Sequence, residues 1–529
     1  MSVIQAGPAP AQQESHITVH DPATQQVVGQ VPIFTAAEIN QAVANARAAQ
    51  PAWAATPLPE RLKIVRRFQQ LLLEQKDAIV QVITRETGKP LAEALATEVL
   101  VVLDGAKYLL DNAAQFLRPE AVPHANPAMK LKRGTLLREA YGVIGIISPW
   151  NYPFSLPSVQ TLTALATGNA VVLKPSEFTP FSSLELQRLL RDAGLADGLL
   201  QVVTGEGGAG AALLHSKIDK LVFTGSVATG KKVAQGAAAR LLPVVLELGG
   251  KDAMVVLEDA NVDVVSSAAV WGAFMNSGQT CLSVERCYVH ETIYEKFLQA
   301  CVAKTAKLHH GPGSEATSDI GPMIHDRQLR IVQAQVDDAV HRGARLLAGG
   351  SAVPQLGPNF FAPTILAEVT HDMDLMREET FGPVLAVRSF RSEDEAVALA
   401  NDSEFGLAAS VWTRDRKRGE AVARRIHAGT VMVNDLISCF GISEAPHGGV
   451  KASGIGRTHG RFGLEEMVWP KYIDSDRMPE MKKLWWYGYG DGFKDQMSGF
   501  VELLFAGNLM KRIRGAVKST KSFIQRKPL

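Results

Sequence analysis

The sequence predicts an α/β protein organised around a doubly wound parallel sheet, and two observations carry this prediction. From Val143 onward, short strands that are apolar throughout alternate with helix-like runs. Strands without a polar face belong in a parallel sheet that helices cover on both faces. The same alternation continues from about Asn261 to His447, which indicates a second α/β unit and a cleft between the two. A ligand of such a sheet is expected at the carboxyl ends of the strands.

The predicted strands divide into two sets. The first set is Val143–Ile147, Ala170–Leu173, Leu200–Val203, Lys220–Phe223, Pro243–Leu246 and Met254–Leu257. Helices between these strands are predicted at Ser182–Ala193, Ala209–Ser216 and Gly230–Ala239. The second set is Cys287–His290, Val384–Arg388, Ser410–Thr413 and Thr430–Asn434.

The part before the first sheet is predicted to be mainly helical. His16–Pro32 alternates around a D-P-A-T turn, which predicts a strand, a turn and a strand. In Thr35–Leu117, apolar residues recur at spacings of three and four, which predicts helices. Lys130–Tyr141 predicts a hairpin with basic strands that face solvent.

The composition is that of a globular protein without a global electrostatic partner. A hydrophobic fraction of 46% and a charged fraction of 21% are ordinary, and a net charge of +1 argues against a nucleic-acid partner. The four cysteines show neither disulfide nor metal-ligand spacing, so we expect no metal site and a reducing, cytoplasmic compartment. No signal peptide is recognised at the start. The uncharged stretch Ala140–Leu173 is interrupted by prolines, so no membrane-spanning helix is expected.

Cys281 is the candidate nucleophile. It stands at the centre of Phe274–Arg286, directly after a Gly-Gln-Thr corner and between an apolar helix-like run and a strand-like run. A free cysteine is most often a small buried hydrophobe. A thiol held at a turn beside a cofactor cleft is the alternative.

Three segments are candidates for binding a nucleotide. Gly205–Gly210 fits G-x-G-x-x-G, but no acidic residue follows about 20 residues later, so a tight turn is favoured. Gly225–Lys231 begins like a P-loop, but Lys232 stands where a magnesium-binding Ser or Thr is required. A strand that runs through Gly225 and Ser226 into a helix nevertheless offers N–H groups to a phosphate. Lys174 and Glu177, just beyond a buried strand, can hydrogen-bond a ribose diol.

Six motifs in order together resemble the NAD(P)-dependent aldehyde dehydrogenase superfamily, with a C-terminal extension added. They are Pro149–Pro153, Gly168–Glu177, Phe223–Ser226, Glu247–Lys251, Gly278–Cys281 and Glu379–Pro383. The resemblance runs from about Ile17 to Leu464. It implies a Rossmann-like cofactor domain, an α/β catalytic domain and a β-hairpin oligomerisation element, in homodimers or homotetramers.

The domain boundaries that follow are expectations. They are a flexible tail at 1–14, an NAD-binding domain at 15–126 and 142–250, a catalytic domain at 251–447, an oligomerisation element at 127–141 and 463–478, and a basic, amphipathic extension at 479–529.

The resemblance also implies the catalytic roles. Cys281 resembles the nucleophile that forms a thiohemiacetal and then a thioester, and no histidine neighbours it in sequence as a base. Asn151 resembles the side-chain half of an oxyanion hole that the Cys281 N–H completes. Glu247 resembles the base that activates water to hydrolyse the thioester. Relatives that transfer the acyl group to coenzyme A tend to lack this glutamate, so Glu247 favours release of a free acid.

The cofactor contacts are likewise implied by the motifs. Lys174 and Glu177 resemble the contacts to the adenosine ribose. A carboxylate at Glu177 favours NAD over NADP, because it accepts a 2′-hydroxyl and repels a 2′-phosphate. The remaining expected contacts are Trp150, Gly225, Ser226, Glu379 and Phe381.

The chain departs from the family pattern around the aldehyde tunnel. His447 stands where phenylalanine is usual, and it either fills space or makes a polar contact to substrate. The glutamate often credited with relaying protons is replaced in Val468–Lys471. The other expected tunnel residues are Tyr152, Leu156, Val159, Leu282 and Phe440. They are mostly apolar and include no arginine, which favours a medium or long apolar or aromatic aldehyde over a semialdehyde.

The segment beyond about Ile473 lies outside the family pattern. Its last 19 residues contain seven lysines and arginines and no acid. Apolar residues fall roughly on one helical face, which is typical of an interfacial membrane helix and also of an arm that packs on a sister subunit, the interpretation that is favoured here. These apolar residues are Phe500, Leu503, Leu504, Met510, Ile513 and Val517.

A function of another class stays open. A catalytically silent relative that serves as a scaffold or membrane adaptor would be expected to have lost Cys281, Glu247 or Asn151, and all three are present. Within enzymes, the runner-up is an acylating, coenzyme A-dependent dehydrogenase, which Glu247 disfavours, and a succinate-semialdehyde-like dehydrogenase is a further alternative.

Overall fold

The structure is a computed structural model that describes residues 15–483 and 485–525. The chain forms two compact units, one of residues up to Arg118 with Arg138–Trp469, the other of Pro119–Leu137 with residues from Pro470 on. The domain boundaries expected from the sequence divide the first unit more finely and stay predictions.

The first sheet of the larger unit has the strand order β17-β9-β8-β5-β6-β7. Neighbouring strands from β7 to β9 run parallel, and only β17 is antiparallel. The order reverses at β5, so the crevice expected to hold a ligand lies at the carboxyl ends of β5 and β8. The predicted strands between Val143 and Leu246 are confirmed. The bounds are β5 Val143–Ile147, β6 Ala170–Lys174, β7 Leu200–Val202, β8 Lys220–Thr224, β9 Val244–Glu247 and β17 Gly454–Ile455.

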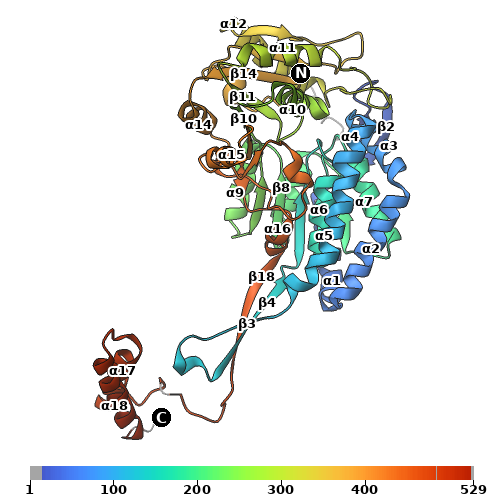
Figure 1. Ribbon diagram of the computed structural model, residues 1–529. Coiled ribbons are helices and arrows are strands. Elements are labelled where there is room, and N and C mark those ends of the chain that lie inside the picture. The colour runs from blue at the N-terminus through green and yellow to red at the C-terminus, as the bar shows by residue number, and fades with distance from the viewer. Residues whose placement is uncertain (1–14, 484, 526–529) are drawn as a thin grey trace, which may run out of the picture. The chain divides into compact units, whose positions relative to one another are not determined.

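Helices cover both faces of this sheet, which confirms the doubly wound α/β architecture (Figure 1). Helices α1 and α8 contact one another and the strands, while α6 and α7 contact the strands and are backed by α2, α3 and α5. The bounds are α1 Ala36–Ala55, α2 Leu58–Glu74, α3 Lys76–Thr87, α4 Leu91–Ala94, α5 Leu100–Leu117, α6 Ser155–Ala166, α7 Pro180–Asp192, α8 Gly207–His215, α9 Val227–Ala238 and α16 Gly460–Glu466. A separate pair, β1 His16–His20 and β2 Val27–Pro32, forms the predicted strand–turn–strand.

The second sheet has the order β12-β13-β14-β11-β10-β15-β16, parallel except for β12. Its strands are β10 Asp252–Val256, β11 Val284–His290, β12 Arg345–Ala348, β13 Thr364–Ala367, β14 Val384–Phe390, β15 Ala408–Trp412 and β16 Thr430–Val433. Its helices are α10 Val262–Phe274, α11 Tyr294–Thr305, α12 Asp326–His341, α13 Asp374–Arg377, α14 Glu393–Asn401 and α15 Arg416–Ala423.

The assignment of Met254–Leu257 to the first sheet was wrong. Strand β10 lies in the second sheet, between β11 and β15. The physical reason is the connection: parallel neighbours in one sheet need a crossover of about a dozen residues or more. Only four residues, 248–251, separate β9 from β10, so the chain passes into the next sheet.

The hairpin predicted at Lys130–Tyr141 was also wrong. Lys132–Ala140 is one continuous strand, β4, which pairs antiparallel with β3 (Glu120–Val122) and borders β18 (Val468–Asp476) in a three-stranded sheet. A tight hairpin needs a two-residue turn such as Asn-Gly or Asp-Gly, and this segment contains none.

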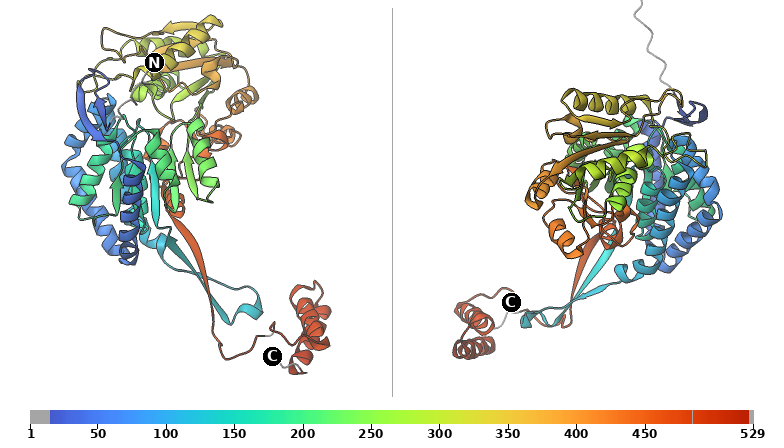
Figure 2. Two further views of the ribbon diagram at one scale, coloured as in Figure 1. Left: turned by 180° about the vertical axis from the view of Figure 1, so that it is seen from behind. Right: turned by 45° about the horizontal axis from the view of Figure 1, so that its top comes forward.

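The smaller unit ends in two helices, α17 (Asp491–Phe505) and α18 (Leu509–Gln525), which lie side by side (Figure 2). The single apolar face expected there is therefore divided between two helices, because 506–508 break the helix. The helices touch at backbone distance: a Cβ on Gly515 would stand 2.6 Å from the Gly499 carbonyl oxygen. Within the described residues, no helix is long and apolar enough to cross a membrane.

Candidate active site

One cavity of about 250 Å³ brings the three expected catalytic residues together. Asn151 follows β5, Glu247 ends β9, and Cys281 lies on the loop that leads into β11. Each therefore comes from the carboxyl end of a strand or from the loop opposite it, where a doubly wound sheet leaves a crevice. The cavity is lined by Pro149, Trp150, Asn151, Leu156, Thr224, Gly225, Ser226, Glu247, Leu248, Gly249, Cys281, Gln328, Ile331, Glu379, Phe381, Leu407 and His447.

The loop before Cys281 has an uncommon backbone conformation. Asn276, Ser277 and Gly278 all have positive φ, of 52°, 56° and 70°. Left-handed conformations at non-glycine residues cost about 1–3 kcal/mol each and persist only where the surroundings hold them. The Ser277 hydroxyl donates to the Gly321 carbonyl at 2.7 Å. The Gln279 side chain accepts from the Ile324 N–H at 2.9 Å, so the loop is fixed from the side away from the cavity.

The surroundings of the Cys281 thiol oppose its ionisation. Withdrawal from water raises its pKa well above the usual value, and the neighbouring carboxyl groups of Asp252, Glu379 and Glu247 raise it further. Forming the thiolate is therefore costly in this environment, and a donor for the developing negative charge is required.

Asn151 is buried, with 5% of its surface exposed, and lines the cavity. Its side-chain Nδ2 donates to the Gln279 carbonyl oxygen at 3.1 Å, two residues before Cys281. The amide is thus held beside the cysteine loop, where one of its N–H groups can serve an oxyanion.

Glu247 is buried and has no hydrogen-bond partner at either carboxyl oxygen. Burial raises its pKa well above the usual value, an effect that Arg457 opposes and Glu466 strengthens. A buried carboxyl group without partners is unusual, because burial of such a group is costly. It suits a base whose partner is a substrate water.

His447 faces this carboxyl group. Its Nε2 lies 3.9 Å from Oε2 of Glu247, beyond hydrogen-bond distance. Burial, together with His459 and Arg457, lowers the pKa of His447 to about 3, so the imidazole is neutral. Its ring packs edge-on against Phe440, with centroids 5.1 Å apart.

Five of the expected cofactor contacts line the same cavity: Trp150, Gly225, Ser226, Glu379 and Phe381. Ser226 is the N-cap of α9, where it accepts from the Thr229 N–H, so the positive end of the helix faces the cavity. Glu379 accepts from the Gly250 N–H at 3.0 Å, and burial raises its pKa to about 8. The Trp150 and Phe381 rings meet edge-on at 5.3 Å. A helix N-terminus beside two aromatic rings and a carboxyl group fits a dinucleotide.

Lys174 and Glu177 lie elsewhere. They form an ion pair of 3.2 Å at the end of β6, and Glu177 lines a second cavity of about 880 Å³ with Phe178 and His325. Both side chains lie at the carboxyl end of β6, where the ribose contact is expected.

The structure brings only part of the expected tunnel to the cavity. Leu156 and His447 line it, whereas the other four residues do not. Val159 and Leu282 are buried in the two cores. The Tyr152 hydroxyl shares a hydrogen bond of 2.8 Å with Thr280, and its ring lies 6.4 Å from that of Phe440. A role in substrate binding for these four stays a prediction.

Sequence reasoning missed several residues of the cavity. Gln328 and Ile331 come from α12, one turn apart on a helix whose sequence carries no motif. Gln328 donates to the carbonyls of Thr380 and Phe381 at 3.0 and 3.3 Å and so supports the segment that carries Phe381. Leu407 lies before β15. No local pattern distinguishes these residues from ordinary core and surface positions.

Comparisons with known proteins agree with this geometry. The model of the "Aldehyde dehydrogenase family" matches residues 9–473. A 4,4'-diapolycopene aldehyde oxidase of Methylomonas sp is 39% identical over 516 residues, covering 96% of this chain and 95% of that protein. A second similar protein, from Mycobacterium ulcerans, has a name that contains succinate-semialdehyde dehydrogenase and NADP(+). It is 39% identical over 448 residues, and the match covers 84% of this chain and 86% of that protein.

A solved structure agrees as well. The NAD+ complex of an aldehyde dehydrogenase from Bacillus cereus superposes with a TM-score of 0.83 at 34% identity, covering 87% of this chain and 93% of that one. The similar proteins named with a nicotinamide cofactor thus include one with NADP(+) and one with NAD+. From its motifs, its fold and these matches over nearly its whole length, the chain belongs to the aldehyde dehydrogenase family.

Proposed function

We propose that this chain oxidises long, apolar aldehydes to carboxylic acids with NAD, through a covalent adduct on Cys281. The observation that carries the proposal is the cavity in which Cys281, Asn151 and Glu247 meet. Its described lining residues include two carboxyl groups and neither lysine nor arginine.

Addition of the thiol is the first step. The Cys281 thiol loses its proton to solvent, the sulfur attacks the carbonyl carbon, and the C=O π electrons move to oxygen, which gives the anion of a tetrahedral thiohemiacetal. Asn151 Nδ2 leaves the Gln279 carbonyl and, with the Cys281 N–H, donates to the new oxyanion. One such donor contributes about 3 kcal/mol to the transition state. The high pKa of the thiol makes this stabilisation necessary.

Release of the acid is the second step. When bound, NAD supplies the acceptor for the hydride that the thiohemiacetal carbon loses as it becomes a thioester. Glu247, as carboxylate, then takes a proton from water while the water oxygen bonds to the acyl carbon. The carbon–sulfur bond breaks and the thiol is restored. The balance is aldehyde, water and NAD+ to acid, NADH and a proton.

The cofactor is held by residues on both cavities. Gly225 and Ser226, at the start of α9, receive the pyrophosphate, and Glu379 with Phe381 holds the nicotinamide ribose. Lys174 and Glu177 receive the adenosine ribose. The Glu177 carboxylate accepts the 2′-hydroxyl and repels a 2′-phosphate, so NAD is preferred to NADP.

Two observations support an apolar substrate. An anionic substrate such as a semialdehyde would find no lysine or arginine among the described lining residues, and an unpaired charge is unfavourable in a buried site. The Methylomonas relative is named for an aldehyde of 4,4'-diapolycopene. Its match covers 96% of this chain and therefore includes most of the segment 479–529. The match to the Mycobacterium ulcerans relative covers 84% of this chain.

A substrate profile tests the proposal. NADH formation at 340 nm is measured for a series of straight-chain aldehydes from short to long, with succinate semialdehyde as the second candidate. We expect kcat/KM to rise with chain length and to be lowest for the semialdehyde. A preference for succinate semialdehyde would refute the apolar assignment, and activity that survives Cys281→Ala would refute the mechanism.

The proposal includes contact between α18 and an anionic membrane. Among its described residues, α18 carries five cations and no acid: Lys511, Arg512, Arg514, Lys518 and Lys521. The side of α18 that carries Gly515 packs on α17. The apolar side chains of Leu509, Met510, Ile513 and Val517 are between 51% and 73% exposed. An exposed apolar stripe beside cations suits an anionic lipid surface. Two copies would instead bring like charges together.

Co-sedimentation with phosphatidylserine vesicles tests this contact. We expect the parent chain to sediment and Ile513→Ser/Val517→Ser to stay in the supernatant, while Leu73→Ser, at a similarly exposed apolar position on α2, behaves as the parent. Equal sedimentation of parent and double variant would refute the contact.

Light scattering on the same proteins measures the homodimer or homotetramer that we propose. Loss of that oligomer in the double variant would favour packing of α18 on a sister subunit.

A further inference from the structure

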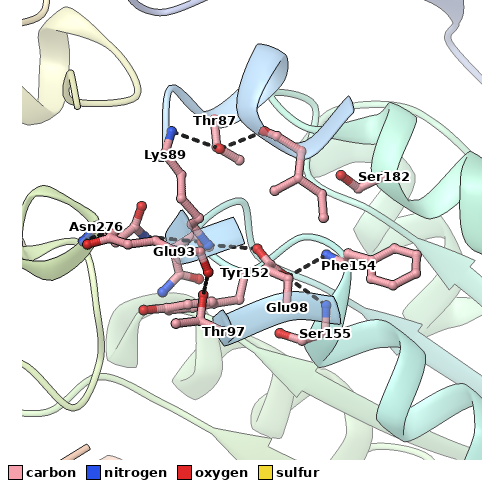
Figure 3. Close-up of polar contacts among 12 residues, drawn as sticks. Thr87, Lys89, Glu93, Thr97, Glu98, Tyr152, Phe154, Ser155, Ser182 and Asn276 are labelled. Carbon is pink, nitrogen blue, oxygen red and sulfur yellow. Dashed lines mark hydrogen bonds and ion pairs between the residues drawn. The ribbon is translucent and has the colours of Figure 1, made fainter. Parts of the chain in front are cut away.

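A fully buried ion pair lies beneath the Asn151 loop (Figure 3). Lys89 follows α3, and Glu98 lies in η1 (Leu95–Val99), a π-helical turn between α4 and α5. Lys89 Nζ is 2.7 Å from Glu98 Oε1, and neither side chain is exposed. Burying two charges is costly unless their remaining hydrogen-bonding capacity is also used, so their other contacts reveal their role.

Those contacts fall on both ends of the Asn151 loop. Lys89 Nζ also donates to the Asn151 carbonyl oxygen at 2.9 Å. The second oxygen of Glu98 accepts from the N–H groups of Phe154 and Ser155, at 3.1 and 2.7 Å, where α6 begins. A carboxylate at a helix start satisfies free N–H groups and opposes the helix dipole. The ion pair thus fixes the loop at residue 151 and at residues 154–155.

A second carboxyl group reaches the Cys281 loop from the helix directly before η1. Glu93, on α4, accepts from the backbone N–H of Asn276 at 2.9 Å. The side chain of Asn276 donates to the carbonyls of Asn151 and Gln279, at 3.2 and 3.1 Å. Asn276 thereby links the loop that carries the oxyanion amide with the loop that carries the nucleophile.

Two consecutive helical elements serve the two loops: Glu93 lies on α4, and Glu98 lies in the π-turn η1 that follows it. Glu93 and Glu98 are five positions apart, which places them on different faces of an α-helix. A π-turn closes i→i+5 hydrogen bonds and brings residues five apart round to the same side, and such turns are frequent at functional sites. In Figure 3 the Glu98 carboxyl group contacts Lys89 and the start of α6, and Glu93 lies beside Asn276, from whose N–H it accepts.

We propose that Lys89, Glu93 and Glu98 are positioning residues that set the Asn151 amide and the Cys281 N–H at the spacing required by the oxyanion. The proposal rests on the proposed function, because it assigns a role to the supports of the same site. The left-handed backbone at Asn276 and Ser277 agrees with it, since strained residues persist only where their surroundings hold them.

The test compares two reactions of Cys281 in full-length protein. The rate of the first-turnover NADH burst with a saturating long-chain aldehyde needs the oxyanion site, whereas alkylation by iodoacetamide needs only the thiol. In Lys89→Met we expect the burst rate to fall about 10²-fold, as for a misplacement of about 1 Å. The alkylation rate and the KM for NAD are expected to stay near the parent values.

Two variants separate positioning from folding. Lys89→Met leaves Glu98 without its cation and is expected to lower Tm, and Lys89→Met/Glu98→Gln removes that unpaired charge. We expect the double variant to recover Tm and to keep the slow burst. Glu86→Gln, measured at saturating NAD because Glu86 lines the second cavity with Glu177, is the matched control: Glu86 accepts from Phe181 and Ser182 N–H at the start of α7 in the same way. Its burst is expected to match that of the parent.

Three results would overturn the proposal: an unchanged burst in Lys89→Met, a burst that recovers with Tm in the double variant, or equal losses of burst and alkylation rates. A parent protein that forms no NADH with any aldehyde would instead refute the proposed function itself.

Discussion

Replacing Glu247 by glutamine removes the proposed base and almost nothing else. Both carboxyl oxygens lack hydrogen-bond partners and the residue is 4% exposed, so the isosteric amide breaks no hydrogen bond and keeps the size of the side chain. The substitution also removes a buried acid whose pKa burial raises. We therefore expect Glu247→Gln to fold with a Tm at or above that of the parent.

The kinetic consequence is confined to one step. A general base contributes about 10²–10⁴-fold, or about 3–5 kcal/mol of activation free energy. Thioester formation does not need this base once the thiol is deprotonated. Stopped-flow measurement at 340 nm should therefore show a burst of about one NADH per active site, as expected when an acyl-enzyme accumulates, followed by a steady rate reduced by about 10²–10⁴-fold.

The reasoning would be refuted by a different pattern in the same assay. If burst and steady rate fall together, Glu247 acts before the thioester forms. If the steady rate stays within about tenfold of the parent, a margin below the general-base range, another group activates the water. Asn151→Ala is the matched comparison, because loss of an oxyanion donor should slow the burst itself.

Four further outcomes are expected. In Glu177→Ser, kcat/KM with NADP should rise relative to kcat/KM with NAD. An unchanged ratio would show that another group distinguishes the 2′-hydroxyl of NAD from the 2′-phosphate of NADP. The steady-state rate should fall as pH is lowered through the raised pKa of Glu247, since the protonated acid cannot accept a proton from water; a rate independent of pH between 5 and 9 would contradict this. His447→Phe should leave kcat and its pH profile near the parent values, because the imidazole is already neutral, and a lost basic limb would show that it carries a proton. Gly515→Leu should abolish vesicle sedimentation and spare oxidation of soluble aldehydes, because its side chain meets the backbone of α17; sedimentation equal to the parent would show that α18 binds alone.

Much of the fold could be predicted because strands buried on both faces appear in the sequence as uninterrupted runs of apolar residues. The same property caused the error at β10, since a strand such as Met254–Val256 suits either sheet. Only the length of its connection to β9 decides between them. The C-terminal apolar residues gave the right helical period but not the number of helices, because the break depends on one short segment around Gly507.

The residues of the candidate site likewise include some that the sequence predicts and some that it does not. Cys281, Asn151 and Glu247 lie in recognisable motifs, and the structure gathers them in one cavity. Lys89 and Glu98 were overlooked because a lysine and a glutamate in a helical region are ordinarily solvated. Their burial depends on α6 and the loop at Asn276, which are distant in sequence. Gln328 was missed for the same reason.

Trapping the acyl-enzyme tests the central claim most directly. Glu247→Gln is mixed with NAD and a long-chain aldehyde, and its intact mass is measured together with that of Glu247→Gln/Cys281→Ala. We predict a mass increase equal to one acyl group in the first protein, located at Cys281 by peptide mapping, and none in the second. An adduct that persists without Cys281, or none in Glu247→Gln while NADH forms, would contradict oxidation through a thioester on this cysteine.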